Sequence, residues 1–133
     1  MKKLSVAIHG TGFIGLVSGC CFAIKGFRVI NSTFNGENCD KINRGESPFF
    51  ENGLTELLKE AVNSGNYKCV IGREKAVMES DISMIAVGTP MREDKSVDLK
   101  FIEQTAKQLG QALKKKNDYH VIVVRSTVVP GTT

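Results

Sequence analysis

The chain of 133 residues is 41% hydrophobic and 24% charged, a length and composition typical of one folded domain with a single core. Its net charge of +4 is a mild excess and excludes the strongly basic stripe of a nucleic-acid-binding protein. No apolar run approaches the roughly 18 residues that cross a bilayer, so we expect a cytoplasmic protein without membrane contact.

Short apolar runs alternate with amphipathic stretches along the chain, a pattern typical of β-α units around a parallel sheet. In chain order, the predicted elements are a strand at 4–8, a helix at 13–25, a strand at 27–30, helices at 35–43 and 54–62, a strand at 67–71, a helix at 74–79, a strand at 82–87, a helix at 98–116 with Asp98 as its N-cap, and a strand at 121–124. We expect the charged segment 91–97 to be mobile. The fold class is therefore α/β, a Rossmann-type doubly wound parallel sheet of strand order 3-2-1-4-5 in one domain, residues 1–133.

Two further features have ordinary structural explanations. The run Lys114-Lys115-Lys116 closes the last predicted helix, where cations complement the helix dipole, so we expect a solvated helix end rather than a phosphate patch. The four cysteines lack metal-ligand spacing, and we predict free thiols in or near the core and no metal site. These cysteines are Cys20, Cys21, Cys39 and Cys69.

The segment His9-Gly10-Thr11-Gly12-Phe13-Ile14-Gly15 contains a G-x-G-x-x-G fingerprint. It follows the first predicted strand and opens the first predicted helix, which is the context in which this motif binds a dinucleotide. Gly10 permits the tight turn, Gly12 lets a pyrophosphate approach the backbone, and Gly15 lets the helix pack closely on the strand. The helix N-terminus then offers free N–H groups to the phosphates. A glycine turn with a purely structural role is the alternative.

Dinucleotide-binding domains usually carry an acidic residue about 20 positions further on, where it binds a ribose 2′-hydroxyl. The stretch from Val29 to Asn35 holds no carboxylate, and Thr33 is the residue placed to accept that hydroxyl, with a contribution from Asn35. The loss of one charged hydrogen bond costs about 1.5–3 kcal/mol, or roughly tenfold to a hundredfold in affinity. No arginine directly follows Thr33 to receive a 2′-phosphate, so we expect weakened binding of NAD rather than a preference for NADP.

Several separated motifs stand along the chain in a set order. They are Gly10-Thr11-Gly12-Phe13-Ile14-Gly15-Leu16-Val17, Asn43-Arg44-Gly45-Glu46-Ser47-Pro48, Glu51-Asn52-Gly53-Leu54, Ala86-Val87-Gly88-Thr89-Pro90, Val97-Asp98-Leu99 and Ser126-Thr127-Val128-Val129-Pro130-Gly131-Thr132. With these motifs the chain resembles, nearly end to end, the N-terminal NAD-binding domain of the UDP-glucose/GDP-mannose dehydrogenase family. Other Rossmann enzymes, such as methyltransferases, do not account for them.

The resemblance implies an oxidoreductase that converts the C6 hydroxyl of a nucleotide sugar to a carboxylate in two steps, with two molecules of NAD. It implies that Thr89 contacts the cofactor and that Thr127 lies near the nicotinamide and the reacting carbon, as an auxiliary catalytic residue. An ordinary strand-end cap is the alternative for each threonine. The predicted cofactor-binding residues are Gly10, Thr11, Gly12, Phe13, Ile14, Gly15, Thr33, Val87, Gly88, Thr89, Pro90, Ser126 and Thr127.

The chain also departs from the family pattern. Thr33 stands where the family has its acidic residue of the second strand. His9 occupies a strand position that is usually apolar, and we expect a packed or hydrogen-bonded histidine there rather than a phosphate ligand. The family's catalytic cysteine, with its partner lysine, asparagine and aspartate, lies beyond Thr133, and none of the cysteines present aligns with it.

We therefore expect a domain truncated after the fifth strand, without the family's central helix and UDP-binding domain. Such a domain would bind NAD without turnover by itself and would meet a nucleotide sugar only together with the missing domain. The alternative is a non-catalytic or degenerate nucleotide-binding module, which the residue at Thr33 supports. The open edge of the fifth strand would favour self-association.

Overall fold

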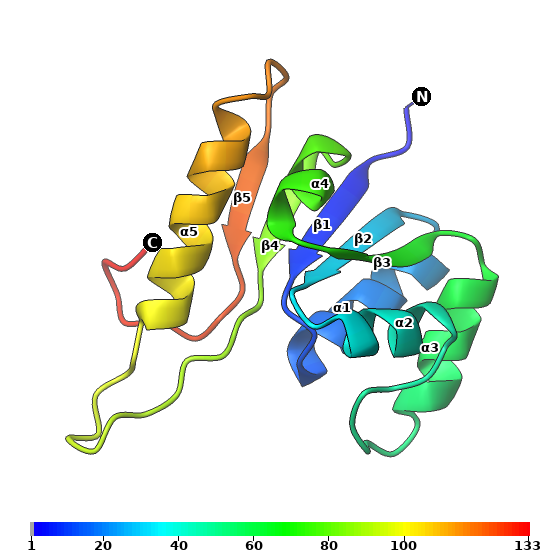
Figure 1. Ribbon diagram of the computed structural model, residues 1–133, viewed down its shortest axis with the longest axis horizontal. Coiled ribbons are helices and arrows are strands. Elements are labelled where there is room, and N and C mark those ends of the chain that lie inside the picture. Colours follow the sequence, from blue (N-terminus) through cyan, green and yellow to red (C-terminus); the bar gives the residue numbers. More distant parts are fainter. Residues whose placement is uncertain (1) are drawn as a thin grey trace.

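A five-stranded parallel sheet lies at the centre of the computed structural model, which describes residues 2–133 (Figure 1). The strand order is β3-β2-β1-β4-β5, which confirms the predicted topology. In chain order the elements are β1 (Ser5–His9), α1 (Phe13–Ile24), β2 (Arg28–Thr33), α2 (Gly36–Asn43), α3 (Leu54–Asn63), β3 (Tyr67–Ile71), α4 (Arg73–Met78), β4 (Ile82–Ile85), α5 (Lys100–Leu113) and β5 (Val121–Val124).

Helices cover both faces of this sheet. Helices α1, α2 and α3 share one core with it, and α4 packs against α5 on the opposite face. Because side chains alternate along a strand, Val6 and Ile8 of β1 join the core beneath α1, while Ala7 packs with Ala76 of α4. All five residues of β1 are buried, as expected of a strand covered on both sides.

The second strand is longer than predicted. We expected it to end at Ile30, but it continues through Asn31 and Ser32 to Thr33. Because Asn31 and Ser32 are polar and follow an apolar run, we expected a loop to begin there. Both side chains are buried in the sheet and have hydrogen-bond partners. The extra residues place Thr33, rather than Ile30, at the carboxyl end of the strand.

Most other boundaries differ from the predictions by one to three residues. Strand β4 ends at Ile85 rather than at residue 87, and α4 begins one residue earlier than predicted. Helix α5 has Leu99 as its N-cap residue and ends at Leu113. Asp98 still caps this helix end, because its Oδ1 accepts a hydrogen bond from the Lys100 N–H at 3.0 Å. The segment before it is closed by an antiparallel bridge between residues 91 and 97; its mobility stays a prediction.

The cysteines are free thiols, as predicted, but the expected place in or near the core is wrong for one of them. Cys20, Cys39 and Cys69 are buried, whereas Cys21 is exposed on α1. Burial raises the pKa of Cys20 to about 12, so this thiol stays protonated and acts as a small apolar side chain.

No helix within residues 2–133 combines the length and apolar character that a membrane crossing requires.

Candidate functional site

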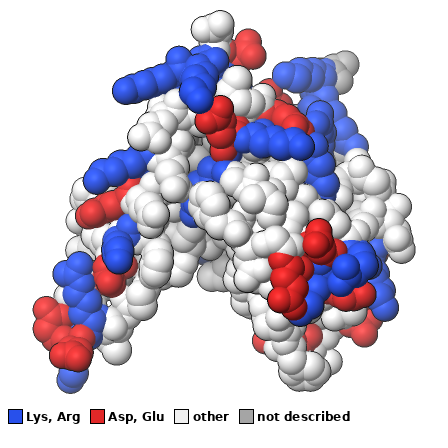
Figure 2. All heavy atoms as spheres, viewed as in Figure 1, with Lys and Arg blue, Asp and Glu red and all other residues white. Residues whose placement is uncertain are grey.

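A cleft of about 270 Å³ opens at the carboxyl ends of the central strands, where the strand order reverses between β1 and β4. Ligands of doubly wound sheets bind at this position. Figure 2 shows the surface hollowed at this end of the molecule, between the loop that follows β4 and the helices α1 to α3. The cleft is lined by Gly12, Phe13, Ile14, Ala86, Val87, Gly88, Thr89, Ser126 and Thr127.

All of these lining residues except Ala86 belong to the set that the sequence predicts to bind the cofactor. The structure thus brings together three loops that are far apart in the chain. The other predicted residues do not line the cleft: Gly10, Thr11 and Gly15 belong to the turn beside it, Pro90 lies one residue outside it, and Thr33 stands at the end of β2.

The glycine turn holds the backbone in a form that a larger residue would disturb. Gly10 has φ +130°, and a Cβ there would lie 2.4 Å from the Ala86 carbonyl oxygen. A Cβ on Gly15 would lie 2.4 Å from the Gly10 carbonyl oxygen. Both glycines are therefore required by the fold, because each contact is with rigid backbone.

Gly12 differs from these two glycines. Its φ of −77° suits any residue, and a Cβ there would meet nothing within 4 Å. It is the N-cap residue of α1, no side chain caps this helix, and no acidic residue lies in its first turn. The first N–H groups of α1 therefore face open space beside a residue without a side chain, which is the arrangement that receives a phosphate.

A buried amide supports the turn from below. Asn31 Nδ2 donates to the carbonyl oxygens of Ile8 at 2.9 Å and Gly10 at 2.8 Å. Its Oδ1 accepts a hydrogen bond from the Tyr67 hydroxyl at 2.8 Å. Sequence reasoning missed both residues. The signal was present, because an asparagine inside an otherwise apolar strand is retained only where its hydrogen bonds are satisfied.

The loops after β4 and β5 are joined by Ser126. Its hydroxyl donates to the Val87 carbonyl at 2.6 Å, and its N–H donates to the Ile85 carbonyl at 3.1 Å. The hydroxyls of Thr89 and Thr127 make no hydrogen bond within residues 2–133 and remain free for a ligand. Ser126 thus holds the cleft wall, whereas the two threonines present unused polar atoms in it.

The end of β2 carries no carboxylate. Thr33 Oγ1 accepts a hydrogen bond from the Asn35 N–H at 3.1 Å, and Asn35 Oδ1 caps α2 by accepting from the Asn38 N–H at 3.0 Å. The next acidic residue, Glu37, pairs with Lys41 at 2.8 Å, and this contact lowers the pKa of the Glu37 carboxyl. Thr33 and Asn35 therefore each already accept a hydrogen bond from the backbone of this chain, and only their remaining hydrogen-bonding capacity is open to a ligand.

Comparison with known proteins decides the family. The UDP-glucose/GDP-mannose dehydrogenase family, NAD binding domain, matches residues 4–133. The chain belongs to this family. It is 38% identical over 129 residues to the GDP-mannose 6-dehydrogenase of Azotobacter vinelandii, covering 97% of this chain and 30% of that protein. It is 39% identical over 132 residues to the UDP-glucose 6-dehydrogenase TuaD of Bacillus subtilis, covering 99% and 28%.

Solved structures of the family superpose closely. A ternary complex of the GDP-mannose dehydrogenase from Pseudomonas aeruginosa matches with a TM-score of 0.91 at 38% identity, over 96% of this chain and 29% of that one. The UDP-glucose dehydrogenase from the archaeon Pyrobaculum islandicum matches with a TM-score of 0.94 at 36% identity, over 99% and 31%. The chain spans about 30% of the length of the curated relatives that it matches first. The matched part is the NAD-binding domain of the family.

His9, at the end of β1 in this family member, is a buried hydrogen-bonded histidine, as predicted. It is fully buried, with Nδ1 2.7 Å from Ser32 Oγ and Nε2 3.0 Å from Ser83 Oγ. Burial, assisted by the charges of Arg73 and His120, lowers its pKa to about 3. The ring is therefore neutral at physiological pH, and it shares the face of Ala7, opposite to α1.

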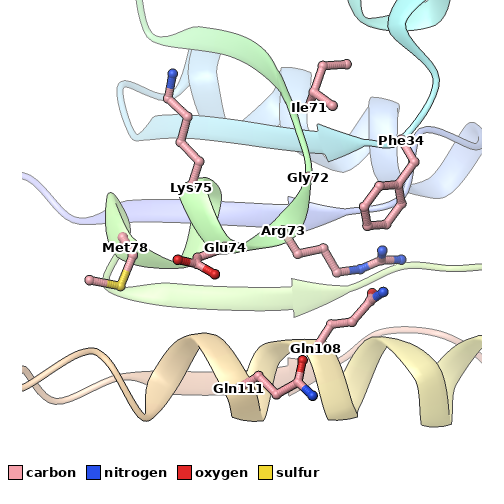
Figure 3. Close-up of a pocket in the computed structure, with 9 residues that line it drawn as sticks. All are labelled: Phe34, Ile71, Gly72, Arg73, Glu74, Lys75, Met78, Gln108 and Gln111. Atoms are coloured by element: carbon pink, nitrogen blue, oxygen red, sulfur yellow. The ribbon is translucent and has the colours of Figure 1, made fainter.

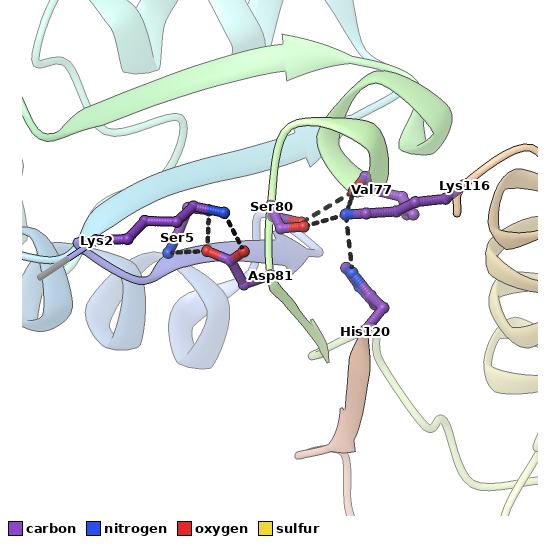
Figure 4. Close-up of polar contacts among 7 residues, drawn as sticks. All are labelled: Lys2, Ser5, Val77, Ser80, Asp81, Lys116 and His120. Atoms are coloured by element: carbon purple, nitrogen blue, oxygen red, sulfur yellow. Dashed lines mark hydrogen bonds and ion pairs between the residues drawn. The ribbon is translucent and has the colours of Figure 1, made fainter. Parts of the chain in front are cut away.

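The prediction for the lysine run was partly wrong. Figure 4 shows Lys116 Nζ turned inward, where it donates to the carbonyl oxygens of Val77, at 2.8 Å, and of Ser80. It also lies 3.2 Å from His120 Nδ1. Lys115 pairs with Glu74 at 3.0 Å. Lys114 and Lys115 are exposed, as predicted for a solvated helix end, whereas Lys116 ties the end of the helix to the chain at the amino ends of the strands, away from the cleft.

Asp81 makes further polar contacts at the amino ends of the strands. It accepts hydrogen bonds from the N–H and the hydroxyl of Ser5, at 2.9 and 2.8 Å, and pairs with Lys2 at 2.9 Å (Figure 4). The Ser5 N–H, with Lys2 and the Ser5 hydroxyl, lowers the pKa of the Asp81 carboxyl well below its usual range.

On the face seen in Figure 2, acidic and basic side chains are intermixed, without the continuous basic stripe of a nucleic-acid-binding surface.

Proposed function

We propose that the cleft between the glycine turn and the loop after β4 holds the pyrophosphate of NAD. The observation that carries this proposal is the open space at Gly12, because a residue with no steric need to be glycine stands at an uncapped helix N-terminus that faces the cleft. A Cβ at this position would fill the space that a diphosphate needs. Bound there, NAD would supply a hydride acceptor.

The remaining lining residues support an orientation of the cofactor. The free hydroxyls of Thr89 and Thr127 lie in the cleft beyond the glycine turn, on the β4–β5 side. We propose that Thr89 contacts the cofactor and that Thr127 lies near its nicotinamide end. Thr33, at the end of β2, would then face the adenosine ribose on the other side of the turn.

The substrate follows from the relatives. The curated relatives are dehydrogenases of GDP-mannose and UDP-glucose, and we propose that the chain serves NAD-dependent oxidation of the C6 alcohol of a nucleotide sugar. None of the cysteines lines the cleft. We therefore propose that residues 1–133 form one dinucleotide-binding domain that does not turn over by itself. The cytoplasmic location stays a prediction.

Chemical-shift mapping tests the site. On addition of NADH, we expect backbone chemical-shift changes centred on residues 10–15 and 88–90, with a dissociation constant between about tens of micromolar and millimolar, because one charged ribose contact is absent. Shifts confined to residues 114–116 would indicate a nonspecific polyanion site instead. That result would contradict the proposed function, including the alternative of a nucleotide-binding module without catalysis.

A further inference from the structure

A guanidinium lies beside the end of β2, although no arginine follows that strand in the sequence. Thr33 of β2 is paired with Ile71 of β3, and the Gly72 N–H donates to the Thr33 carbonyl at 2.8 Å. The next residue is Arg73. Its guanidinium carbon lies 4.7 Å from the centroid of the Phe34 ring, so the arginine stacks on the residue that directly follows Thr33.

The side chain of Arg73 extends toward the carboxyl edge of the sheet. In Figure 3 it runs in the direction of the strand arrows and reaches the Phe34 ring, while Lys75 points away from this edge. Together with the Phe34 contact, this orientation places the guanidinium beside the carboxyl end of β2, on the adenosine side of a bound dinucleotide.

Arg73 has no anionic partner within residues 2–133. Its Nη2 donates to the Thr105 hydroxyl at 3.0 Å, but its buried Nε has no acceptor, and Oε1 of nearby Gln108 is also unpaired. The adjacent Glu74 is paired with Lys115. A half-buried arginine without a carboxylate is unusual, since such groups are normally paired. Burial accordingly lowers the pKa of Arg73.

These groups border a groove of about 550 Å³ between α4 and α5 (Figure 3). Its lining at the strand ends combines the Phe34 ring, the bare backbone of Gly72 and the Arg73 guanidinium. A planar guanidinium with free N–H groups matches a phosphate dianion. The repulsive carboxylate that excludes such a dianion in NAD-specific domains is absent, because Thr33 stands in its place.

We propose that Arg73 receives a 2′-phosphate on the adenosine ribose, so that this domain binds NADP at least as tightly as NAD. The inference rests on the proposed function, since it assumes a dinucleotide across the glycine turn. It assigns a specificity role to Arg73, a residue outside every motif that identified the family. In this inference, Thr33 takes the place of the carboxylate that would repel a 2′-phosphate, and the Arg73 guanidinium attracts it.

Calorimetric titrations of NAD and NADP into the wild-type chain and Arg73→Met test this inference. A 2′-phosphate makes charged hydrogen bonds, so NADP affinity should fall by roughly tenfold to a hundredfold in the variant, while NAD affinity changes by less than about threefold. Lys75→Met is the matched control, because it removes one charge from the same helix without touching the strand ends. It should leave both affinities near the wild-type values.

A second measurement needs no variant. The ³¹P resonance of the NADP 2′-phosphate titrates with a pKa of about 6 in the free nucleotide, and contact with a guanidinium should lower this value on binding. If the wild-type chain binds NAD but binds NADP measurably more weakly, or if the pKa of the 2′-phosphate is unchanged on binding, the inference is overturned and the proposed function stays intact. Binding of neither dinucleotide would overturn both.

Discussion

Acidification should destabilise this domain through His9. The ring is fully buried between Ser32 and Ser83, and its pKa of about 3 in the folded chain lies far below the ordinary value of 6.5 that it regains on unfolding. Between these two values the unfolded chain binds a proton that the folded chain does not. Stability therefore rises with pH across this window and is lost as the pH falls below about 6.5.

The magnitude follows from the same two values. Each pH unit inside the window is worth about 1.4 kcal/mol. A change from pH 7 to pH 5 crosses about 1.5 units of the window, so the free energy of unfolding should fall by about 2 kcal/mol from His9 alone. At pH 5 a carboxyl group of lowered pKa, such as that of Asp81, contributes little, because it is ionised in the folded chain and, at its ordinary pKa of 3.8, mostly ionised in the unfolded chain as well.

Urea unfolding at pH 7, 6 and 5, followed by circular dichroism, measures this effect. His9→Gln keeps polar atoms near the two serine hydroxyls but cannot be protonated, so its stability should change little over this range. His120→Gln is the control, because it removes the other histidine of the chain. His120 is only partly buried, and burial and the charge of Lys116 lower its pKa. An equal pH slope in wild type and His9→Gln would refute the assignment.

Three further predictions concern the turn, the second strand and the sheet edge. Gly15→Ala should lower the free energy of unfolding by about 1–3 kcal/mol, because its Cβ would lie 2.4 Å from a backbone oxygen; an unchanged melting temperature would contradict this. Thr33→Asp should tighten NAD binding by roughly tenfold and weaken NADP binding in calorimetry, and no gain for NAD would refute our account of the second strand. The chain should self-associate with concentration in gel filtration, through the β5 edge and an apolar groove that includes Val123; Val123→Lys should suppress this, whereas a wild-type monomer at all concentrations would contradict it.

Much of the fold could be predicted from short-range patterns. The strands β3 and β5 lie where their apolar runs predicted, and the alternation of strands and helices, with the glycine turn after the first strand, indicated the order β3-β2-β1-β4-β5. The predicted end of β2 was wrong because Asn31 and Ser32 are polar. Their burial depends on partners from other strands, which no local pattern reveals.

The same reason explains what was missed in the site. The lining of the cleft comes from motifs that are recognisable one by one, so nearly all of its residues were among those predicted to bind the cofactor. Arg73 belongs to no motif, and its place beside Phe34 depends on the pairing of β2 with β3. We sought an arginine directly after Thr33 in the sequence, but in the structure the cation beside this strand end comes from the first residue of α4, just after the neighbouring strand β3.

The central claim is that a dinucleotide phosphate lies against the backbone at Gly12, and one comparison tests it most directly. Gly12→Ala should unfold at nearly the wild-type temperature, because its Cβ meets nothing and a small loss at the N-cap offsets the gain in chain rigidity. In a calorimetric titration, the same variant should lose about tenfold or more in NAD affinity, since the methyl group fills the space for the pyrophosphate. Wild-type affinity for NAD in a folded Gly12→Ala chain would contradict the account.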